Sequence, residues 1–478
     1  MFTSSYFRPV TPRSAGRVVL ALGLTGAALV GHAQQKPANA APRVSSIGES
    51  LQKAGQHPLH ILYVHGIGAT GAGDSWELQK SICRLMKGCS IPKNPVPVGR
   101  DYADHGEFAV GAEPPPLKYM GDPVWTGTDD WSASAPFVDH YVLRRSDGAP
   151  VVVDEINWWP LVFPLKCRHI MPGEATLAGP EKGLLGLCSQ NTVKDSGHPH
   201  RYRAFTWLDP NKAKELESMK ARAALVNRLL KDDVLDWRFS DAVMAVGSMH
   251  AIFREGIRQL ILESVRFTAD GQKTEAWEKQ LAETGAGDRE FVVVSHSLGS
   301  YLIFSTLNLD QHDNAPQETT PNAAQPQPDS SAAGREDAAA RYVFERTSQV
   351  YFLANQLPFL SLASVQATQT AAGPEAFRSR MRQWAELRQK FTEQRSGAEA
   401  VALRPPQIVA WSDPSDLLSW CIPAEKPLLI TNLYVRNTWW RWLIANPQAV
   451  HDNYDKNKGV LKIIMGTQSI PEKGEVCY

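Results

Sequence analysis

The chain has 478 residues, of which 43% are hydrophobic and 21% are charged, so it can bury a large core in one or several domains. Its formal net charge is zero, and it contains no long basic block. Nucleic-acid binding depends on clustered Lys and Arg side chains that face phosphates, so this composition argues against a nucleic-acid partner.

The N-terminal 33 residues have the pattern of a secretory signal peptide. The first segment is basic (Arg8, Arg13 and Arg17), residues 18–31 are largely apolar, and small residues precede a cleavage site after Ala33. The alternative is a membrane anchor, but a membrane span needs about 20 apolar residues. We therefore expect cleavage near Ala33 and export to the periplasm or the medium.

The six cysteines all lie after the expected cleavage site. Their order along the chain suggests the pairs Cys83–Cys89, Cys167–Cys188 and Cys421–Cys477. No C-x-x-C spacing occurs, so a zinc ribbon or a thioredoxin-like motif lacks support. Buried free thiols are the alternative, but an oxidising compartment favours disulfides.

The first half of the mature chain combines buried strands with a long segment of unassigned pattern. Residues 34–56 are polar and predict a flexible leader. Apolar runs predict strands at 59–64, 137–145 and 149–159, and helical patterns follow at 209–237 and about 241–266. No motif covers the region near 101–240 as a whole, and we expect a cap-like insertion there.

The second half alternates strands and helices. An apolar strand runs into a helix-like segment within residues 290–307, and further strands are predicted at 350–354, 407–411 and 428–435. Residues 374–396 and a tryptophan-rich segment at 437–447 have helical patterns. Residues 309–340 are rich in Gln, Pro, Asp and Ala and predict a disordered insertion. This alternation predicts an α/β fold with a mostly parallel sheet covered by helices on both faces.

The sequence FVVVSHSLGSYLIFSTL, which begins at Phe291, suggests a serine nucleophile on a strand-to-helix turn. In such a turn Ser297 would stand above the carboxyl end of the sheet, and the helix N-terminus would face the charge that develops on the substrate. Small residues must flank the serine, and Ser295 and Gly299 meet that requirement. The alternative is a plain buried turn. We interpret the neighbouring His296 as a packing residue whose side chain points away from Ser297.

A nucleophile of this kind requires an acid and then a base later in the chain. Only one histidine follows residue 312, so His451, in a polar segment expected to be a loop, is the predicted base. Two acids follow the predicted strand at 407–411. We favour Asp416 as the acid that orients His451, with Asp413 as the alternative, because an aspartate before proline commonly caps a turn.

The first strand is followed by His65, Gly66, Ile67 and Gly68. The backbone N–H of Ile67 could pair with that of Leu298 as two oxyanion donors. A glycine-rich turn without chemistry is the alternative, and a phosphate-binding loop is disfavoured because no G-K-[ST] follows.

These four motifs together resemble the α/β-hydrolase superfamily, in particular its bacterial esterase- and lipase-like serine hydrolases. The motifs are VHGIG, SHSLGS, SDPSDLLSW and ANPQAVHDNY. The resemblance implies a domain in two parts, at 57–308 and 341–478, and a Ser297–His451–Asp416 triad supported by His65, Gly66 and Gly299. It implies hydrolysis of a small-molecule or lipid ester through an acyl-enzyme, without a cofactor or a metal.

Several alternatives remain open from the sequence. The same fold could transfer the acyl group to an alcohol, or the chain could be a catalytically silent binding protein of the cell envelope. His198 and His200 have no consistent set of further metal ligands around them. The apolar run at 157–165 is either core or a lid that contacts lipid, and peripheral membrane contact is therefore possible. The oligomeric state and the substrate are not determined by these patterns.

Overall fold

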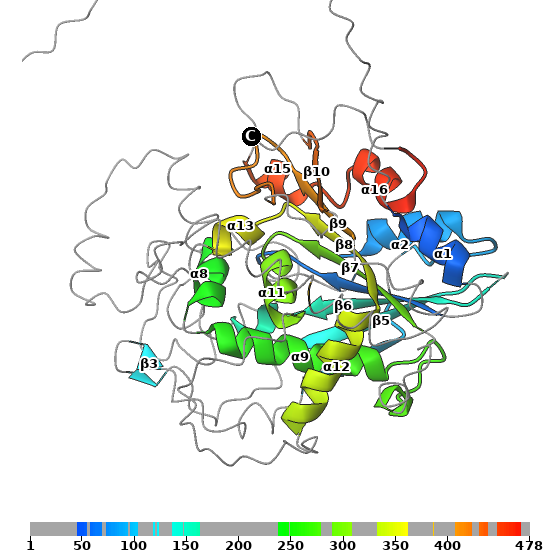
Figure 1. Cartoon of the computed structure of the whole chain (residues 1–478), viewed down its shortest axis with the longest axis horizontal. Helices are drawn as coiled ribbons and strands as arrows, with labels where there is room; N and C mark the ends of the chain where they lie inside the picture. Colours follow the sequence, from blue (N-terminus) through cyan, green and yellow to red (C-terminus); the bar gives the residue numbers. More distant parts are fainter. Residues whose placement is uncertain are drawn as a thin grey trace, which may run out of the picture. The chain divides into compact units, whose positions relative to one another are not determined.

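The computed structural model describes the part of the chain that carries the central sheet and the helices that pack on it (Figure 1). The described residues are 45–54, 58–68, 73–93, 96–103, 118–119, 122–123, 136–146, 148–162, 238–247, 249–278, 289–307, 332–361, 386, 407–422, 430–437 and 447–469. The predicted signal peptide and the predicted helices at 209–237 and 374–396 lie outside these ranges, apart from residue 386.

An eight-stranded, mostly parallel sheet forms the centre of the fold. Its strands, from one edge to the other, are β10 (Ile430–Tyr434), β9 (Gln407–Ser412), β8 (Thr347–Leu353), β7 (Glu290–His296), β1 (Leu59–Val64), β6 (Val151–Asn157), β5 (Phe137–Leu143) and β2 (Gly99–Tyr102). Neighbours from β10 to β6 pair in parallel, whereas β5 pairs antiparallel with both β6 and β2. The predicted α/β class is therefore confirmed. A separate two-stranded ribbon joins β3 (Lys118–Tyr119) and β4 (Asp122–Pro123).

Most strands of the sheet are buried on both faces because helices cover each face, whereas the edge strand β2 is partly exposed. Alternate residues of a central strand enter two different apolar clusters: in β1, Leu62 and Val64 face one cluster, and Ile61 and Tyr63 face the other. The helices of the first cluster are α8 (Ser240–Val246), α9 (His250–Arg266), α11 (Leu298–Leu307), α12 (Ala332–Arg346) and α13 (Leu357–Leu360). Those of the second are α1 (Ile47–Ala54), α2 (Trp76–Leu85) and α16 (Lys458–Met465), which lie together in Figure 1.

Two predicted irregular segments are partly helical. Residues 47–54 of the predicted leader form α1, whose Ile47 and Leu51 are buried against the sheet. Residues 332–340 of the predicted disordered insertion begin α12, in which Ala339 and Ala340 are fully buried. Both predictions are wrong for these residues because a few apolar side chains at helical spacing suffice once a sheet is present to pack against.

The region near 101–240 is not a single cap-like insertion. It contributes β5 and β6 to the main sheet, and a short 3-10 turn (Trp159–Leu161) follows β6. Trp158, Leu161 and Val162 are buried, so residues 157–162 of the apolar run belong to the core. Residues 163–237 lie outside the described part of the chain.

The predicted disulfide between Cys83 and Cys89 is confirmed. It joins the last turn of α2 to the segment that follows the helix. Cys421 is also disulfide-bonded, with a partner outside the described residues, so its pairing with Cys477 stays a prediction. Cys167 and Cys188 lie outside the described residues as well.

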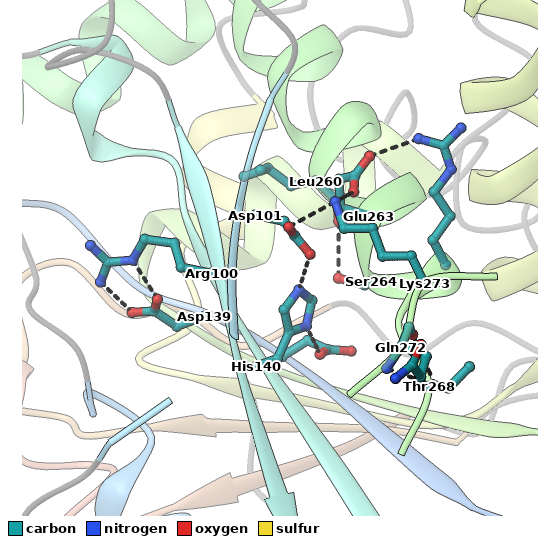
Figure 2. A network of polar contacts seen from close by, with 12 residues as sticks. Arg100, Asp101, Asp139, His140, Leu260, Glu263, Ser264, Thr268, Gln272 and Lys273 are labelled. Atoms are coloured by element: carbon teal, nitrogen blue, oxygen red, sulfur yellow. Dashed lines mark hydrogen bonds and ion pairs between the residues drawn. The ribbon is translucent and has the colours of Figure 1, made fainter. Parts of the chain in front are cut away.

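A polar network ties the antiparallel edge strands together (Figure 2). His140 of β5 lies between two carboxylates, with Nδ1 2.6 Å from Asp154 Oδ1 and Nε2 3.1 Å from Asp101 Oδ2. Burial alone would lower the pKa of His140, but the hydrogen bonds to Asp101 and Asp154 raise it to about 9. The imidazole is therefore charged at neutral pH, and its ring stacks on Phe267 at 4.0 Å between centroids.

The network extends from the sheet to α9. Lys273 Nζ lies 2.7 Å from Asp101 Oδ1 and 2.7 Å from Glu263 Oε2. Arg100 of the edge strand β2 donates two hydrogen bonds to Asp139, at 2.6 and 2.8 Å. We refer to Asp101, His140, Asp154 and Lys273 as the edge network, because they link the outermost strands with the covering helix.

Candidate active site

The carboxyl ends of β1 and β7 form the point where the chain changes sides of the sheet. The connection after β1 leads to α2 on one face, whereas β7 leads directly into α11 on the other face. Loops that diverge in this way leave a crevice at the carboxyl ends of parallel strands, where α/β proteins bind their ligands. Ser297 and the loop at 65–68 both lie at this point.

Ser297 occupies a constrained turn between β7 and α11. Its φ is 53°, a left-handed conformation that is unusual for a residue other than glycine. The turn is held because Ser297 N–H donates to the carbonyl of Leu353 at 2.7 Å, and Ser300 N–H donates to the carbonyl of Ser297 at 3.0 Å. The serine is thus presented on a rigid strand-to-helix turn.

Two glycines allow the backbone segments around Ser297 to approach each other. A Cβ on Gly299 would lie 2.5 Å from the carbonyl oxygens of both Val64 and His65, so α11 could not approach β1 so closely with a larger residue. A Cβ on Gly66 would lie 2.9 Å from the Cβ of Ser297. The loop after β1 therefore abuts the serine directly.

Ser295 stands two residues before Ser297, where glycine is usual in this motif. It is fully buried, and its hydroxyl donates to Ser300 Oγ at 3.1 Å. The extra hydroxymethyl group is therefore accommodated by a partner on α11, as expected for a tolerated packing variation.

His451 lies beside Ser297, although the two residues are 154 positions apart. Its Nε2 is 2.7 Å from Ser297 Oγ, and its Nδ1 is 3.0 Å from each carboxylate oxygen of Asp416. The residue belongs to the short helix α15 (Pro447–Asp452), so the prediction that it lies in a loop is wrong. All three side chains are buried, and their interactions are therefore strengthened by low-dielectric surroundings.

The two candidate acids after β9 have different partners. Asp416 faces His451, whereas Asp413 accepts hydrogen bonds from the backbone N–H groups of Ser415 at 2.8 Å and Asn437 at 2.7 Å. Asp413 therefore caps the turn at Pro414, as an aspartate before proline commonly does. Of the two, only Asp416 contacts the imidazole among the hydrogen bonds of the described residues.

The environment of Asp416 keeps its carboxylate charged. Burial alone would raise the pKa of Asp416, but hydrogen bonds from His451, Leu418 N–H and Tyr454 lower it below its ordinary value. The charged carboxylate favours the tautomer of His451 with a proton on Nδ1, which leaves Nε2 free to accept from the serine hydroxyl.

The loop after β1 is built from buried, mutually supporting contacts. His65 stacks on Trp158 with 4.8 Å between ring centroids, and Trp158 Nε1–H donates to the carbonyl of His65 at 3.1 Å. Burial lowers the pKa of His65 to about 3, so its ring is neutral. Gly68 N–H donates to the buried carboxylate of Asp241 at 2.8 Å. These contacts fix the loop that carries Ile67 next to Ser297. Leu298 directly follows Ser297 and begins α11. The role of the Ile67 and Leu298 N–H groups as oxyanion donors stays a prediction.

Two side chains near the site were not assigned a functional role from the sequence. His296 donates from Nε2 to the carbonyl of His451 at 3.0 Å, and burial, followed by the nearby His451, lowers its pKa to about 4. Tyr454 donates to Asp416 Oδ2 at 3.0 Å. The sequence offers one sign that Tyr454 lies near the site, its position three residues after His451. That sign can be interpreted only when the place of His451 in the fold is known.

The remaining sequence candidates concern metal binding and membrane contact. His198, His200 and residues 438–446 lie outside the described part of the chain. Within the described residues, no three His, Cys, Asp or Glu side chains are grouped in a way that could hold a metal ion. None of the helices described for this chain is long and apolar enough to cross a membrane.

No protein-family model matches the chain, and no curated protein or solved structure is significantly similar to it. Support for a function therefore comes from the geometry of the site.

Proposed function

We propose that this chain is an exported serine hydrolase of the α/β-hydrolase type that cleaves a carboxylic ester. The observation that carries the proposal is the chain of contacts from Ser297 Oγ through His451 to Asp416, at 2.7 and 3.0 Å. A serine hydroxyl becomes nucleophilic when a base takes its proton, and a carboxylate behind the base fixes its tautomer. The position of Ser297 on a strained strand-to-helix turn at the carboxyl end of the sheet supports the same conclusion.

The proposed reaction has two acyl-transfer steps. In the first, His451 Nε2 takes the proton of Ser297 Oγ, which attacks the ester carbonyl, and the proton then passes to the departing alcohol. In the second, His451 takes a proton from water, the resulting hydroxide attacks the acyl-enzyme, and His451 returns the proton to Ser297 Oγ as the acid is released. The N–H groups of Ile67 and Leu298 are the proposed donors to the oxyanion in both steps. Each such donor typically contributes about 10²–10³ in rate.

Asp416 stabilises the imidazolium that forms in each step. Its carboxylate remains charged because His451, Leu418 and Tyr454 all donate to it. Both carboxylate oxygens lie 3.0 Å from His451 Nδ1, so the carboxylate attracts the imidazolium whichever oxygen accepts the hydrogen bond from Nδ1–H. The carboxylate does not need to accept the proton itself.

Export is part of the proposal. The Cys83–Cys89 disulfide supports it, because disulfides persist in oxidising compartments. Fractionation of the producing cells, with N-terminal sequencing of the mature chain, tests this part. We expect the protein outside the cytoplasm with its N-terminus at residue 34.

Labelling with a fluorophosphonate probe tests the nucleophile. We expect the wild-type chain to be labelled at Ser297 and Ser297→Ala to be unlabelled, with ester hydrolysis reduced about 10⁶-fold. Ser295→Ala is the matched control, because it removes a buried hydroxyl two residues away whose partner is Ser300. This variant should keep its labelling.

A wild-type chain that is not labelled, or labelling that persists in Ser297→Ala, would overturn the proposal in favour of a silent binding protein. Hydrolysis of p-nitrophenyl esters with short to long acyl chains, with and without an added alcohol, distinguishes hydrolysis from acyl transfer. Free acid as the main product in the presence of alcohol is the expected result.

A further inference from the structure

Tyr454 connects the candidate acid to the core of the protein. It lies three residues after His451, and its ring is fully buried in the cluster that α1, α2 and α16 form with the sheet. Only its hydroxyl reaches the polar site, where it lies 3.0 Å from Asp416 Oδ2. The residue thus joins a rigid apolar environment to the carboxylate that faces His451.

The hydrogen bonds of this hydroxyl have defined directions. Asp413 N–H can only donate, and it lies 2.6 Å from the Tyr454 oxygen. The carboxylate of Asp416 can only accept, so the single proton of the hydroxyl must point to Asp416. Ser419 Oγ, at 3.1 Å, can then donate to the remaining lone pair. The proton and the two lone pairs of the Tyr454 hydroxyl therefore each have one assigned partner.

The hydroxyl stays protonated in this setting. Burial, followed by the negative charge of Asp416, raises the pKa of Tyr454 far above its ordinary value. The tyrosine is consequently a permanent neutral donor and not an acid or base in the reaction.

The carboxylate of Asp416 is fixed at both oxygens. Oδ1 accepts from Leu418 N–H at 2.9 Å, and Oδ2 accepts from Tyr454. These two donors set the plane of the carboxylate so that both oxygens lie 3.0 Å from His451 Nδ1. Without the tyrosine hydroxyl, Asp416 Oδ2 would keep only His451 as a donor. Its negative charge would then be less compensated, and it would attract the His451 imidazolium more strongly.

We propose that Tyr454 is a positioning residue of the Ser297–His451–Asp416 site, which orients the Asp416 carboxylate and tunes how strongly it attracts the His451 imidazolium. The inference rests on the proposed function for its catalytic consequence. Its electrostatic consequence, a change in the protonation of His451, can be measured whether or not the chain hydrolyses esters.

The first test compares Tyr454→Phe with Tyr351→Phe. Tyr351 is the matched control: it is fully buried in the same cluster, and its hydroxyl has two partners, the carbonyl of Ser45 at 2.9 Å and Gln349 Oε1 at 2.6 Å. Loss of one hydrogen bond to a charged group predicts that Tyr454→Phe lowers kcat about 10-fold and leaves KM within about 2-fold. The control should leave kcat and KM near their wild-type values.

The second readout is the pH dependence. The acid limb of the kcat/KM profile, and the pH midpoint of the His451 ring signal in NMR of histidine-labelled protein, should both move to higher pH in Tyr454→Phe. A residue with only a structural role would lower the free energy of unfolding without moving either midpoint. Unchanged midpoints and unchanged kcat would overturn the proposal.

A third variant keeps the test decisive if Tyr454→Phe fails to fold. Incorporation of 3-fluorotyrosine at position 454 retains the hydroxyl but makes it a stronger donor, so the His451 midpoint should move to lower pH. A shift to higher pH, or none, would contradict the proposal. Absence of fluorophosphonate labelling together with the expected NMR shifts would reject the hydrolase function alone, so the two failures can be told apart.

Discussion

Two histidine–carboxylate groups, one beside the sheet and one within it, show that the second partner of an imidazole decides whether the histidine can exchange a proton. His451 faces one carboxylate and one hydroxyl, Asp416 and Ser297. His140 faces two carboxylates, Asp154 and Asp101. A hydroxyl has a proton to give to the imidazole, whereas a second carboxylate can only hold the imidazolium in place.

The two groups also occupy different parts of the sheet. The first lies at the carboxyl ends of parallel strands, where loops diverge to opposite faces. Three members of the edge network lie on paired antiparallel strands, and the fourth, Lys273, contacts Asp101 from the segment that follows α9. The pKa of His140, raised to about 9, keeps this histidine charged. The first group can therefore move a proton, and the edge network stabilises the edge of the fold.

After the loss of Ser297 itself, the largest expected effect on hydrolysis separates the two acids near His451. Asp416→Asn should reduce ester hydrolysis about 10⁴-fold, because the imidazole loses the partner that selects its tautomer. Asp413→Asn, three residues away, should reduce hydrolysis by less than about 10-fold, since this carboxylate caps a turn. Steady-state kinetics on folded protein, checked by circular dichroism, gives both values. Equal losses in the two variants would contradict the assignment of Asp416.

The edge network should matter for stability and not for chemistry. His140→Phe leaves the fully buried Asp154 without its closest partner, and we expect the free energy of unfolding to fall by about 3–5 kcal/mol. Urea denaturation measures this loss. Lys273→Met is the control, because Lys273 is 54% exposed and its ion pairs should contribute less than about 1 kcal/mol.

The pH dependence of the free energy of unfolding is a second way to test the stabilising role of the edge network. A histidine whose folded pKa is raised stabilises the fold below its unfolded pKa of about 6.5, and that contribution is lost as the pH rises through about 9. The stability difference between wild type and His140→Phe should therefore narrow above pH 9. The rate of hydrolysis per folded molecule should be unchanged at pH 7, and a rate loss above 10-fold would argue against two separate roles.

The smallest expected effect concerns a carboxyl without a histidine partner. Burial, followed by the charge of Glu155, raises the pKa of Asp74 to about 7, whereas the histidine-paired Asp416 and Asp154 have lowered pKa values. Between about pH 4 and 7 the folded chain holds a proton that the unfolded chain has lost, so stability falls as the pH rises through this window. The asparagine of Asp74→Asn cannot ionise, so this variant does not lose stability in this way as the pH rises.

We expect Asp74→Asn to gain about 1–2 kcal/mol relative to wild type between pH 5 and pH 8, measured by urea denaturation at both values. Glu77→Gln, three residues later and 37% exposed, is the control and should show little such change. A relative loss of stability in Asp74→Asn at the higher pH would show that the Asp74 carboxyl is charged in the folded state.

The sequence by itself determined the features that depend on local pattern. Runs rich in apolar residues predicted β1, β5, β6, β7 and β9, because strands covered on both faces bury most of their side chains. The small residues around Ser297 predicted its turn, since only they permit strand and helix to approach closely. The order of acid and base along the chain then left His451 as the single candidate.

Only the tertiary structure decided which neighbouring groups meet. Asp413 and Asp416 are three residues apart, and their different roles follow from the turn between them and from where α15 places His451. Tyr454 reaches Asp416 because its ring is buried in the apolar cluster that α1, α2 and α16 form with the sheet, which no local pattern encodes. Segments such as α1 form because the sheet supplies an apolar surface. Contacts between residues far apart in sequence depend on packing, and packing is a property of the whole fold.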